Sequence, residues 1–143
     1  MNIPFRNQSI EEISYKGTNI KVTNLERTLI DCLRNLQYSG GVEFIIKSYE
    51  TVKYLNSKYL EDYLSNYSSP VLHARLGFLL EIFKSNWDIP DSFMKKLKKR
   101  IPKHPDYLEG RKSKTGKLIK EWSLIVPQEL FNKFISNDRS LFG

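Results

Sequence analysis

The chain has 143 residues and carries 23 Lys and Arg against 16 Asp and Glu, which gives a net charge of +7 at pH 7. That length suits one domain with a single hydrophobic core, and 40% hydrophobic residues exclude a disordered chain. No apolar run approaches the roughly 20 residues of a membrane span, and the N-terminus lacks the layout of a secretory signal. We therefore expect a single cytoplasmic domain over residues 1–143 that does not engage a membrane.

A β-hairpin followed by a helix is predicted at the N-terminus. Apolar residues recur over 10–15 and alternate over 20–22, on either side of the turn signal Lys16-Gly17-Thr18-Asn19. The helix is expected to start at a capping box, in which Thr23 and Glu26 satisfy backbone N–H groups of the first turn. Its predicted buried face consists of Leu25, Leu29, Cys32, Leu33 and Leu36.

Three further helices are predicted from capping residues and apolar spacing. The first follows the chain break at Gly40-Gly41 and runs from about Val42 to Tyr54, and the second starts at Asn56-Ser57. The third opens at Ser69-Pro70, because serine caps well and proline is tolerated in the first turn. It is apolar almost all round, which predicts a central core helix. Gly77 in its middle costs about 1 kcal/mol against alanine, so we expect it to let a neighbour pack closely.

The C-terminal part is predicted to change from helix to strand. A basic helix should run from Asp88-Ile89-Pro90 to about Arg100, and residues 101–120 read as an exposed basic loop. A strand containing Trp122 and a short final helix follow. Extended pieces at both ends of about five helices predict an α+β fold, with the terminal strands in one antiparallel sheet.

The positive charge is concentrated in one part of the sequence. Residues 95–120 hold eleven Lys or Arg and two Asp or Glu, whereas the rest holds 12 basic and 14 acidic residues. This split indicates a local surface for a polyanion, and the absence of an Arg-rich recognition helix favours contacts with the DNA backbone. The alternative is a solvated lysine-rich segment. The residues expected to bind nucleic acid are Lys95, Lys96, Lys99, Arg100, Arg111, Lys112 and Lys114.

No arrangement of residues predicts catalysis. His73 lies in the apolar helix and is expected to be a hydrogen-bonded packing residue, and His104 is expected to be solvated. These two histidines and the single cysteine, Cys32, cannot form a standard zinc site or a disulfide, and no Gly-rich phosphate loop is present. We therefore expect no enzyme activity, no cofactor and no metal.

The carboxylates allow one other interpretation. Glu26 with Asp31, or Glu81 with Asp88, could coordinate a divalent metal for phosphoryl chemistry. Capping by Glu26 and an i,i+4 ion pair of Arg27 with Asp31 account for the same residues more simply. Arg75 and Glu81, in the apolar helix, are expected to take part in structural ion pairs.

Two motifs in register resemble the C-terminal domain of AbiEi-family antitoxins. The first is VTNLERTLIDCL at 22–33 followed by YSGGVE at 38–43, and the second is ARLGFLLE at 74–81. The resemblance covers residues 5–127, including the strand with Trp122. The motif residues, which we expect to be architectural, are Glu26, Arg27, Asp31, Gly41, Arg75 and Gly77.

The resemblance implies a non-enzymatic antitoxin or transcriptional regulator of an AbiE abortive-infection, type IV toxin–antitoxin system in phage defence. The counterpart of such an antitoxin is a nucleotidyltransferase-like toxin, which it opposes without a stable complex. Family members generally carry an N-terminal winged helix-turn-helix before this domain. Relative to that pattern, the chain starts almost directly at the second domain, so the resemblance implies antitoxicity rather than sequence-specific operator binding.

Two other functions stay open from the sequence. Tyrosine is favoured at protein contacts, and tyrosines recur at Tyr49, Tyr54, Tyr59, Tyr63 and Tyr67. They are compatible with a module that pairs with itself as a homodimer or with a separately encoded DNA-binding subunit. A core rim whose hydroxyls are hydrated is the alternative interpretation of the same tyrosines, and it is slightly favoured. A metal-dependent enzyme acting on nucleic acid is the third hypothesis.

Overall fold

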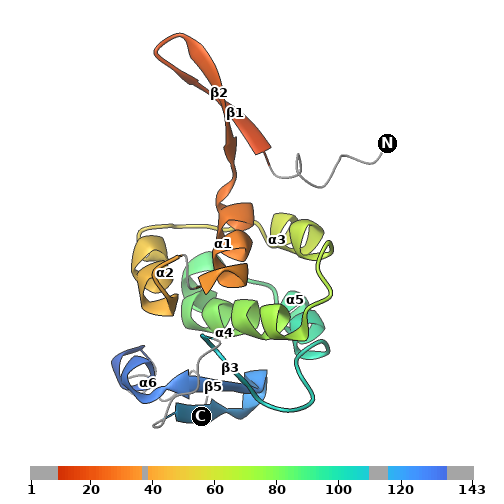
Figure 1. Ribbon diagram of the computed structural model, residues 1–143. Helices are drawn as coiled ribbons and strands as arrows, with labels where there is room; N and C mark the ends of the chain where they lie inside the picture. Colours follow the sequence, from red (N-terminus) through yellow and green to blue (C-terminus); the bar gives the residue numbers. More distant parts are fainter. Residues whose placement is uncertain (1–9, 37–38, 110–115, 135–143) are drawn as a thin grey trace.

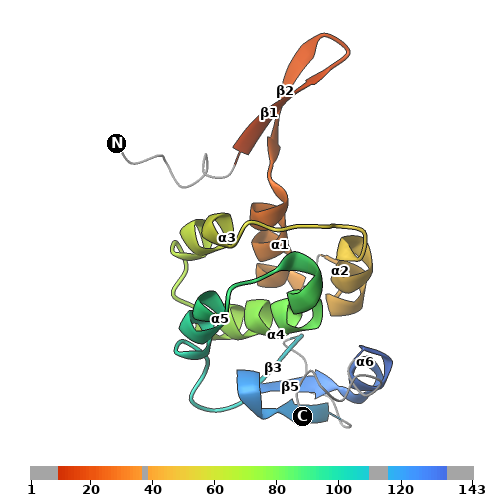
Figure 2. The ribbon, with the colours of Figure 1, turned by 180° about the vertical axis from the view of Figure 1, so that it is seen from behind.

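The computed structural model describes residues 10–36, 39–109 and 116–134. Helices gather around α4, with a small sheet on one side of them and a hairpin projecting beyond α1 on the other (Figures 1 and 2). The elements in chain order are β1 (Ile10–Tyr15), β2 (Thr18–Thr23), α1 (Leu25–Arg34), α2 (Val42–Tyr49), α3 (Ser57–Leu64), α4 (Pro70–Trp87), α5 (Asp91–Lys98), β3 (Asp106–Tyr107), β4 (Gly116–Ile119), the 3₁₀ helix η3 (Lys120–Trp122), β5 (Leu124–Pro127) and α6 (Gln128–Phe134).

The predicted α+β class is confirmed, but the strands form two sheets instead of one. β1 pairs with β2 alone, whereas the second sheet has the order β3-β5-β4. In that sheet β5 runs parallel to β3 and antiparallel to β4. The terminal strands do not meet because β2 leads directly into α1, and the helical layer then separates the hairpin from the C-terminal sheet (Figure 1).

The turn of the predicted hairpin has the backbone that its sequence requires. Lys16 and Gly17 have φ angles of 50° and 77°, and Tyr15 pairs with Thr18 across them. Positive φ at both central residues is the mark of the tight turn whose twist matches that of a hairpin. The hairpin prediction is therefore confirmed down to the position of its turn.

Side-chain caps start α3 and α4 where the sequence predicts them. The Asn56 side chain accepts hydrogen bonds from the backbone N–H groups of Lys58 and Tyr59, at 2.9 and 3.2 Å. The Ser69 hydroxyl accepts one from the N–H of Leu72 at 3.3 Å, with Pro70 in the first turn. Both caps replace hydrogen bonds that the first turn of a helix cannot make internally.

The cap of α1 differs from the predicted capping box. Asn24, not Thr23, is the N-cap, and its side chain accepts a hydrogen bond from the N–H of Arg27 at 2.9 Å. The Thr23 hydroxyl instead lies 2.8 Å from the hydroxyl of Thr28. With the cap shifted by one residue, Glu26 occupies the second position of the helix and its carboxylate is free to reach a different element.

Two boundaries in the sequence-based description also need correction. α2 ends at Tyr49 rather than near Tyr54. Residues 101–120 are not simply a loop, because β3 and β4 lie within them and Leu108 and Ile119 are buried. Trp122 stands in η3, just before the strand to which the alternating pattern assigned it.

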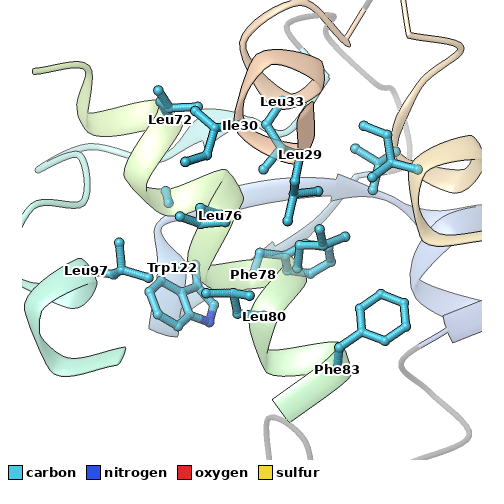
Figure 3. Packing of buried hydrophobic residues seen from close by; sticks show 14 of the residues in the cluster. Leu29, Ile30, Leu33, Leu72, Leu76, Phe78, Leu80, Phe83, Leu97 and Trp122 are labelled. Atoms are coloured by element: carbon cyan, nitrogen blue, oxygen red, sulfur yellow. The ribbon is translucent and has the colours of Figure 1, made fainter. Parts of the chain in front are cut away.

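The hydrophobic core forms around α4, of whose 18 residues ten are buried. This confirms the prediction of a central core helix. Figure 3 shows Leu29, Ile30 and Leu33 of α1 facing α4, while Leu97 of α5 and Trp122 approach it from other sides. Helices α1 and α5 and the C-terminal sheet are thus all packed on one helix.

Gly77 allows the closest of these contacts. A Cβ atom at this position would lie 2.0 Å from Cζ3 of Trp122, a distance at which two carbon atoms cannot coexist. Trp122 is fully buried, and the ammonium group of Lys98 lies 5.3 Å from the centroid of its ring. The sequence-based expectation that Gly77 admits a close neighbour is confirmed.

We expect the substitution Gly77→Ala to lower the free energy of unfolding by about 1–3 kcal/mol, the usual cost of overpacking a core. Urea denaturation measures this change. Without a steric conflict, alanine would stabilise the helix by up to about 1 kcal/mol over glycine. The matched control is Ser85→Ala at an exposed position of α4, which should leave stability nearly unchanged or slightly raised. A Gly77→Ala protein at least as stable as the wild type would contradict the contact.

Candidate functional site

The exposed side of α5 and its C-terminal end carry four of the predicted binding residues. The helix is anchored by Phe93, Met94 and Leu97, which are buried. Positions three and four apart on the opposite side share one face of a helix. The cations exposed there are Lys95, Lys96, Lys99 and Arg100, and we call them the α5 cations. Their place near the C-terminus of the helix also suits the negative end of its dipole.

Three of the α5 cations line a cleft between α3, α4 and α5. Its volume is about 440 Å³, within the range of about 300–1,000 Å³ that is usual for small-molecule sites. The nine lining residues are Glu61, Leu64, Ser65, His73, Phe93, Lys96, Leu97, Lys99 and Arg100. The cleft therefore combines a cationic rim with apolar side chains and one histidine. Lys95 belongs to the exposed helix face and is not part of the lining.

An ion pair links the rim of the cleft from α5 to α3. The ammonium group of Lys96 lies 2.9 Å from Oε1 of Glu61. This hydrogen bond lowers the pKa of Glu61, so the carboxylate stays ionised. Both side chains are exposed, and a pair of this kind contributes at most about 1 kcal/mol to stability. Lys96 can therefore exchange Glu61 for another anion at small cost.

His73 is a buried, hydrogen-bonded residue, as predicted, and it also lines the cleft. Only 4% of its surface is exposed, and Nδ1 lies 2.7 Å from the carbonyl oxygen of Ser69. Burial lowers its pKa below the usual 6.5, with a smaller contribution in the same direction from Arg100. The ring is therefore neutral at pH 7. Since a carbonyl can only accept, Nδ1 carries the proton and Nε2 is left as an acceptor.

Two other bases of the 95–120 window pack away from the α5 cations. Lys98 lies over Trp122, and Lys117 lies over the ring of Phe131 at 5.5 Å from its centroid. These two cations pack on aromatic rings of the C-terminal part instead of lining the cleft. Arg111, Lys112 and Lys114 are outside the described residues.

The motif residue Glu26 connects two helices through a backbone hydrogen bond. Its carboxylate accepts from the N–H of Asn56 at 2.8 Å, and only 7% of the residue is exposed. Asn56 is itself the N-cap of α3, so Glu26 holds the start of α3 against α1. This role replaces the predicted capping box.

The predicted ion pair of Arg27 with Asp31 is confirmed, at 3.3 Å. Two tyrosines of α3 and the following turn complete the cluster. Tyr63 donates a hydrogen bond to Oδ1 of Asp31 at 2.8 Å, and the guanidinium group of Arg27 lies 5.1 Å from the centroid of its ring. Arg34 lies over Tyr67 at 4.1 Å. These contacts join α1 to α3 and support the expectation that Arg27 and Asp31 are architectural.

Gly41 and Arg75 serve the packing of helices. Gly41 has a φ of 87° at the start of α2, where Oε1 of Glu109 accepts a hydrogen bond from the N–H of Val42 at 3.1 Å. Arg75 donates to the carbonyl oxygen of Leu33 at 2.9 Å, at the end of α1. Burial lowers the pKa of Arg75, and the nearby carboxylates of the C-terminal part act in the opposite direction.

The predicted role of Arg75 therefore changes. Arg75 satisfies the carbonyl oxygen of Leu33 in α1, and neither Arg75 nor Glu81 forms an ion pair within the described part of the chain. The two positions are six residues apart in one helix, a spacing that places them on different sides.

The five tyrosines divide between the two interpretations of the sequence. Tyr49 and Tyr63 are buried, and Tyr49 donates a hydrogen bond to the carbonyl oxygen of Leu25 at 2.9 Å. Tyr54 and Tyr59 are 62% and 46% exposed. Tyr67 is partly buried and packs against the core. Tyr49, Tyr63 and Tyr67 thus belong to the core rim, whereas the exposed pair remains available to a partner.

Two features are absent from the described part of the chain. Within it, no three His, Cys, Asp or Glu side chains come together in a way that could hold a metal ion. None of its helices combines the length and apolar character that a membrane crossing requires.

Comparison with protein-family models, with characterised proteins and with solved structures gives no match for this chain. Its function is therefore argued from the site itself.

Sequence reasoning finds the α5 cations but misses the cleft beside them. Glu61 and His73 belong to different helices from Lys96, and 35 residues separate Glu61 from its partner. Nothing in local spacing shows that α3 and α5 lie side by side. Only the packing of both helices near α4 brings these groups together.

Glu26→Ala should lower the free energy of unfolding by about 1–3 kcal/mol, because it leaves the N–H of Asn56 without its acceptor. Glu26→Gln, which keeps a carbonyl oxygen, should lose less. Glu50→Ala removes an exposed glutamate and serves as the control. Urea denaturation of all three variants distinguishes the loss of the hydrogen bond from a general effect of charge. Equal, small losses of unfolding free energy in Glu26→Ala and Glu50→Ala would contradict the role of the hydrogen bond.

Proposed function

We propose that the chain is a non-enzymatic, cytoplasmic domain that binds the nucleic-acid backbone through the α5 cations and acts as the antitoxin of a phage-defence toxin–antitoxin system. The observation that carries the binding part is the exposure of Lys95 and Lys96 on α5, and of Lys99 and Arg100 just past its C-terminal end, while the other side of this helix is buried. A rigid helix presents these charges without first having to order a flexible segment.

Electrostatics favours a polyanion as the ligand of this surface. DNA carries one negative charge per roughly 1.7 Å of helix axis, and each phosphate that a cation neutralises releases counterions. Among the described residues Lys96 is held by the exposed pair with Glu61, so a phosphate can replace that carboxylate. The surface has lysines and a single arginine, which supports contacts with phosphates rather than reading of base edges.

The antitoxin part of the proposal rests on the resemblance of residues 22–33 and 74–81 to AbiEi-family antitoxins. The motif residues have structural roles: Glu26 and Arg27 join α1 to α3, Gly41 starts α2, and Gly77 receives Trp122. These structural roles explain why a chain with this fold would carry the motif residues. The counterpart would be a nucleotidyltransferase-like toxin, opposed without a stable complex.

A protein-interaction module is the second candidate. The exposed side chains that favour it are Phe44, Tyr54 and Tyr59, of which the tyrosines are suited to contacts that are apolar at one end and hydrated at the other. The partner would be a second copy or a separate DNA-binding subunit. Light scattering after size-exclusion chromatography tests this candidate: a strict monomer that ignores such a subunit would exclude it.

Reversing three charges with the variant Lys96→Glu, Lys99→Glu and Arg100→Glu should abolish binding of duplex DNA at low salt. Fluorescence anisotropy with a labelled duplex measures it. The matched control reverses three exposed lysines on other elements, Lys21, Lys47 and Lys53, and changes the net charge equally. Loss of binding in the first variant and its retention in the control are expected. Unchanged binding in the first variant would refute the assignment of the surface.

Co-expression with a nucleotidyltransferase-like toxin of an AbiE system tests the antitoxin part. This chain alone should restore growth of cells that express the toxin, and the Gly77→Ala variant should do so less well because less of it is folded. The toxin's abundance, followed by immunoblot, is the control for an effect on expression. Growth arrest that persists at full levels of both proteins would contradict antitoxicity.

A further inference from the structure

We propose that the cleft between α3, α4 and α5 binds one nucleotide, with its phosphate on the rim and its base inside. The inference rests on the proposed function, since it uses three of the same cations. The inference goes beyond the proposed function because it names a single nucleotide as the unit that the cleft accommodates. The ligand class is a nucleotide, either free or as an unpaired unit of a strand.

Binding of the nucleic-acid backbone does not by itself explain the apolar part of the cleft. A surface that only touches phosphates needs exposed cations and no recess. Here Leu64, Phe93 and Leu97 line a space of about 440 Å³ beside the cations. Phe93 is 5% exposed, so the part of its ring that borders the cleft offers a base an apolar contact beside Leu64 and Leu97.

The cationic rim supplies the complementary end of such a ligand. Lys96, Lys99 and Arg100 all line the cleft, and Glu61 is the one acidic residue among its lining. Glu61 already engages Lys96 at 2.9 Å. A phosphate that displaces this carboxylate would meet up to three cations, whereas a neutral ligand would gain nothing from them.

His73 adds a polar group that can recognise a nucleotide by a hydrogen bond. Among the described residues, Nδ1 of His73 contacts the carbonyl oxygen of Ser69, so Nε2 is the ring atom left for the cleft that His73 lines. A neutral Nε2 accepts, and a nucleotide offers matching donors in its sugar hydroxyls and base amino groups. Sulfate and chloride have no such donor at neutral pH.

This arrangement predicts a preference for unpaired nucleotides. In a duplex the bases are stacked and paired, so they cannot enter a recess without being unpaired at a cost of a few kcal/mol. The exposed side of α5 remains accessible to duplex phosphates. Single strands and free nucleotides should therefore use the cleft, and duplex DNA should use the cations alone.

The test titrates the full chain with adenosine monophosphate, followed by NMR of the histidine rings and by calorimetry. The His73 resonances should shift on binding, and those of His104, which is exposed in the segment after α5, should not. Ser65→Trp places a large side chain at the cleft without removing a charge and should weaken binding by about tenfold or more. The control is Ser68→Trp, an exposed position that does not line the cleft, with unchanged binding expected.

The outcomes separate this inference from the proposed function. Equal binding of adenosine monophosphate to both tryptophan variants, or no shift of His73, would overturn the nucleotide site. Duplex binding that depends on the α5 cations would then still support the proposed function. A short single-stranded oligoadenylate that binds much more tightly than the mononucleotide identifies a strand as the source, and equal affinities identify a free nucleotide; both support the cleft.

Discussion

The arrangement of the molecule depends on the contact between the indole ring of Trp122 and the bare backbone at Gly77. Any Cβ at that position would overlap the ring, so the C-terminal sheet can reach α4 only at a glycine. The same ring lies beneath the ammonium group of Lys98, which belongs to α5 (Figure 3 shows Trp122 next to Leu97). One buried aromatic side chain thus fixes α4, α5 and the C-terminal sheet relative to one another.

The candidate site follows from this packing. Because Phe93, Met94 and Leu97 are buried, α5 turns its cations outward at a fixed orientation, and α3 lies close enough for Glu61 to reach Lys96. The cleft between these helices brings an apolar lining, a neutral histidine and a cationic rim into one place. Each group has an ordinary structural explanation by itself, and their convergence is what supports binding of a phosphate-bearing ligand.

The sequence predicted most reliably those features that are decided locally. The helix caps at Asn56 and Ser69 depend on backbone hydrogen bonds within a few residues, and both caps are confirmed. The close neighbour of Gly77 depends on the absence of a side chain at that position, and it is confirmed as well. The partner of Glu26 lies 30 residues away in a different helix, and local spacing cannot identify it. The pairing of β3 escaped prediction for a similar reason, since a strand of two residues leaves no alternation to detect.

The salt dependence of duplex binding by the unaltered protein tests the central claim, that the α5 cations meet a polyphosphate backbone. Four cations that each neutralise a phosphate should make the logarithm of the association constant fall with the logarithm of salt concentration at a slope of about −3 to −4. A slope of this size, measured by anisotropy across a range of salt concentrations, is the predicted result. Undetectable binding at low salt, or an affinity that salt does not change, would contradict the account.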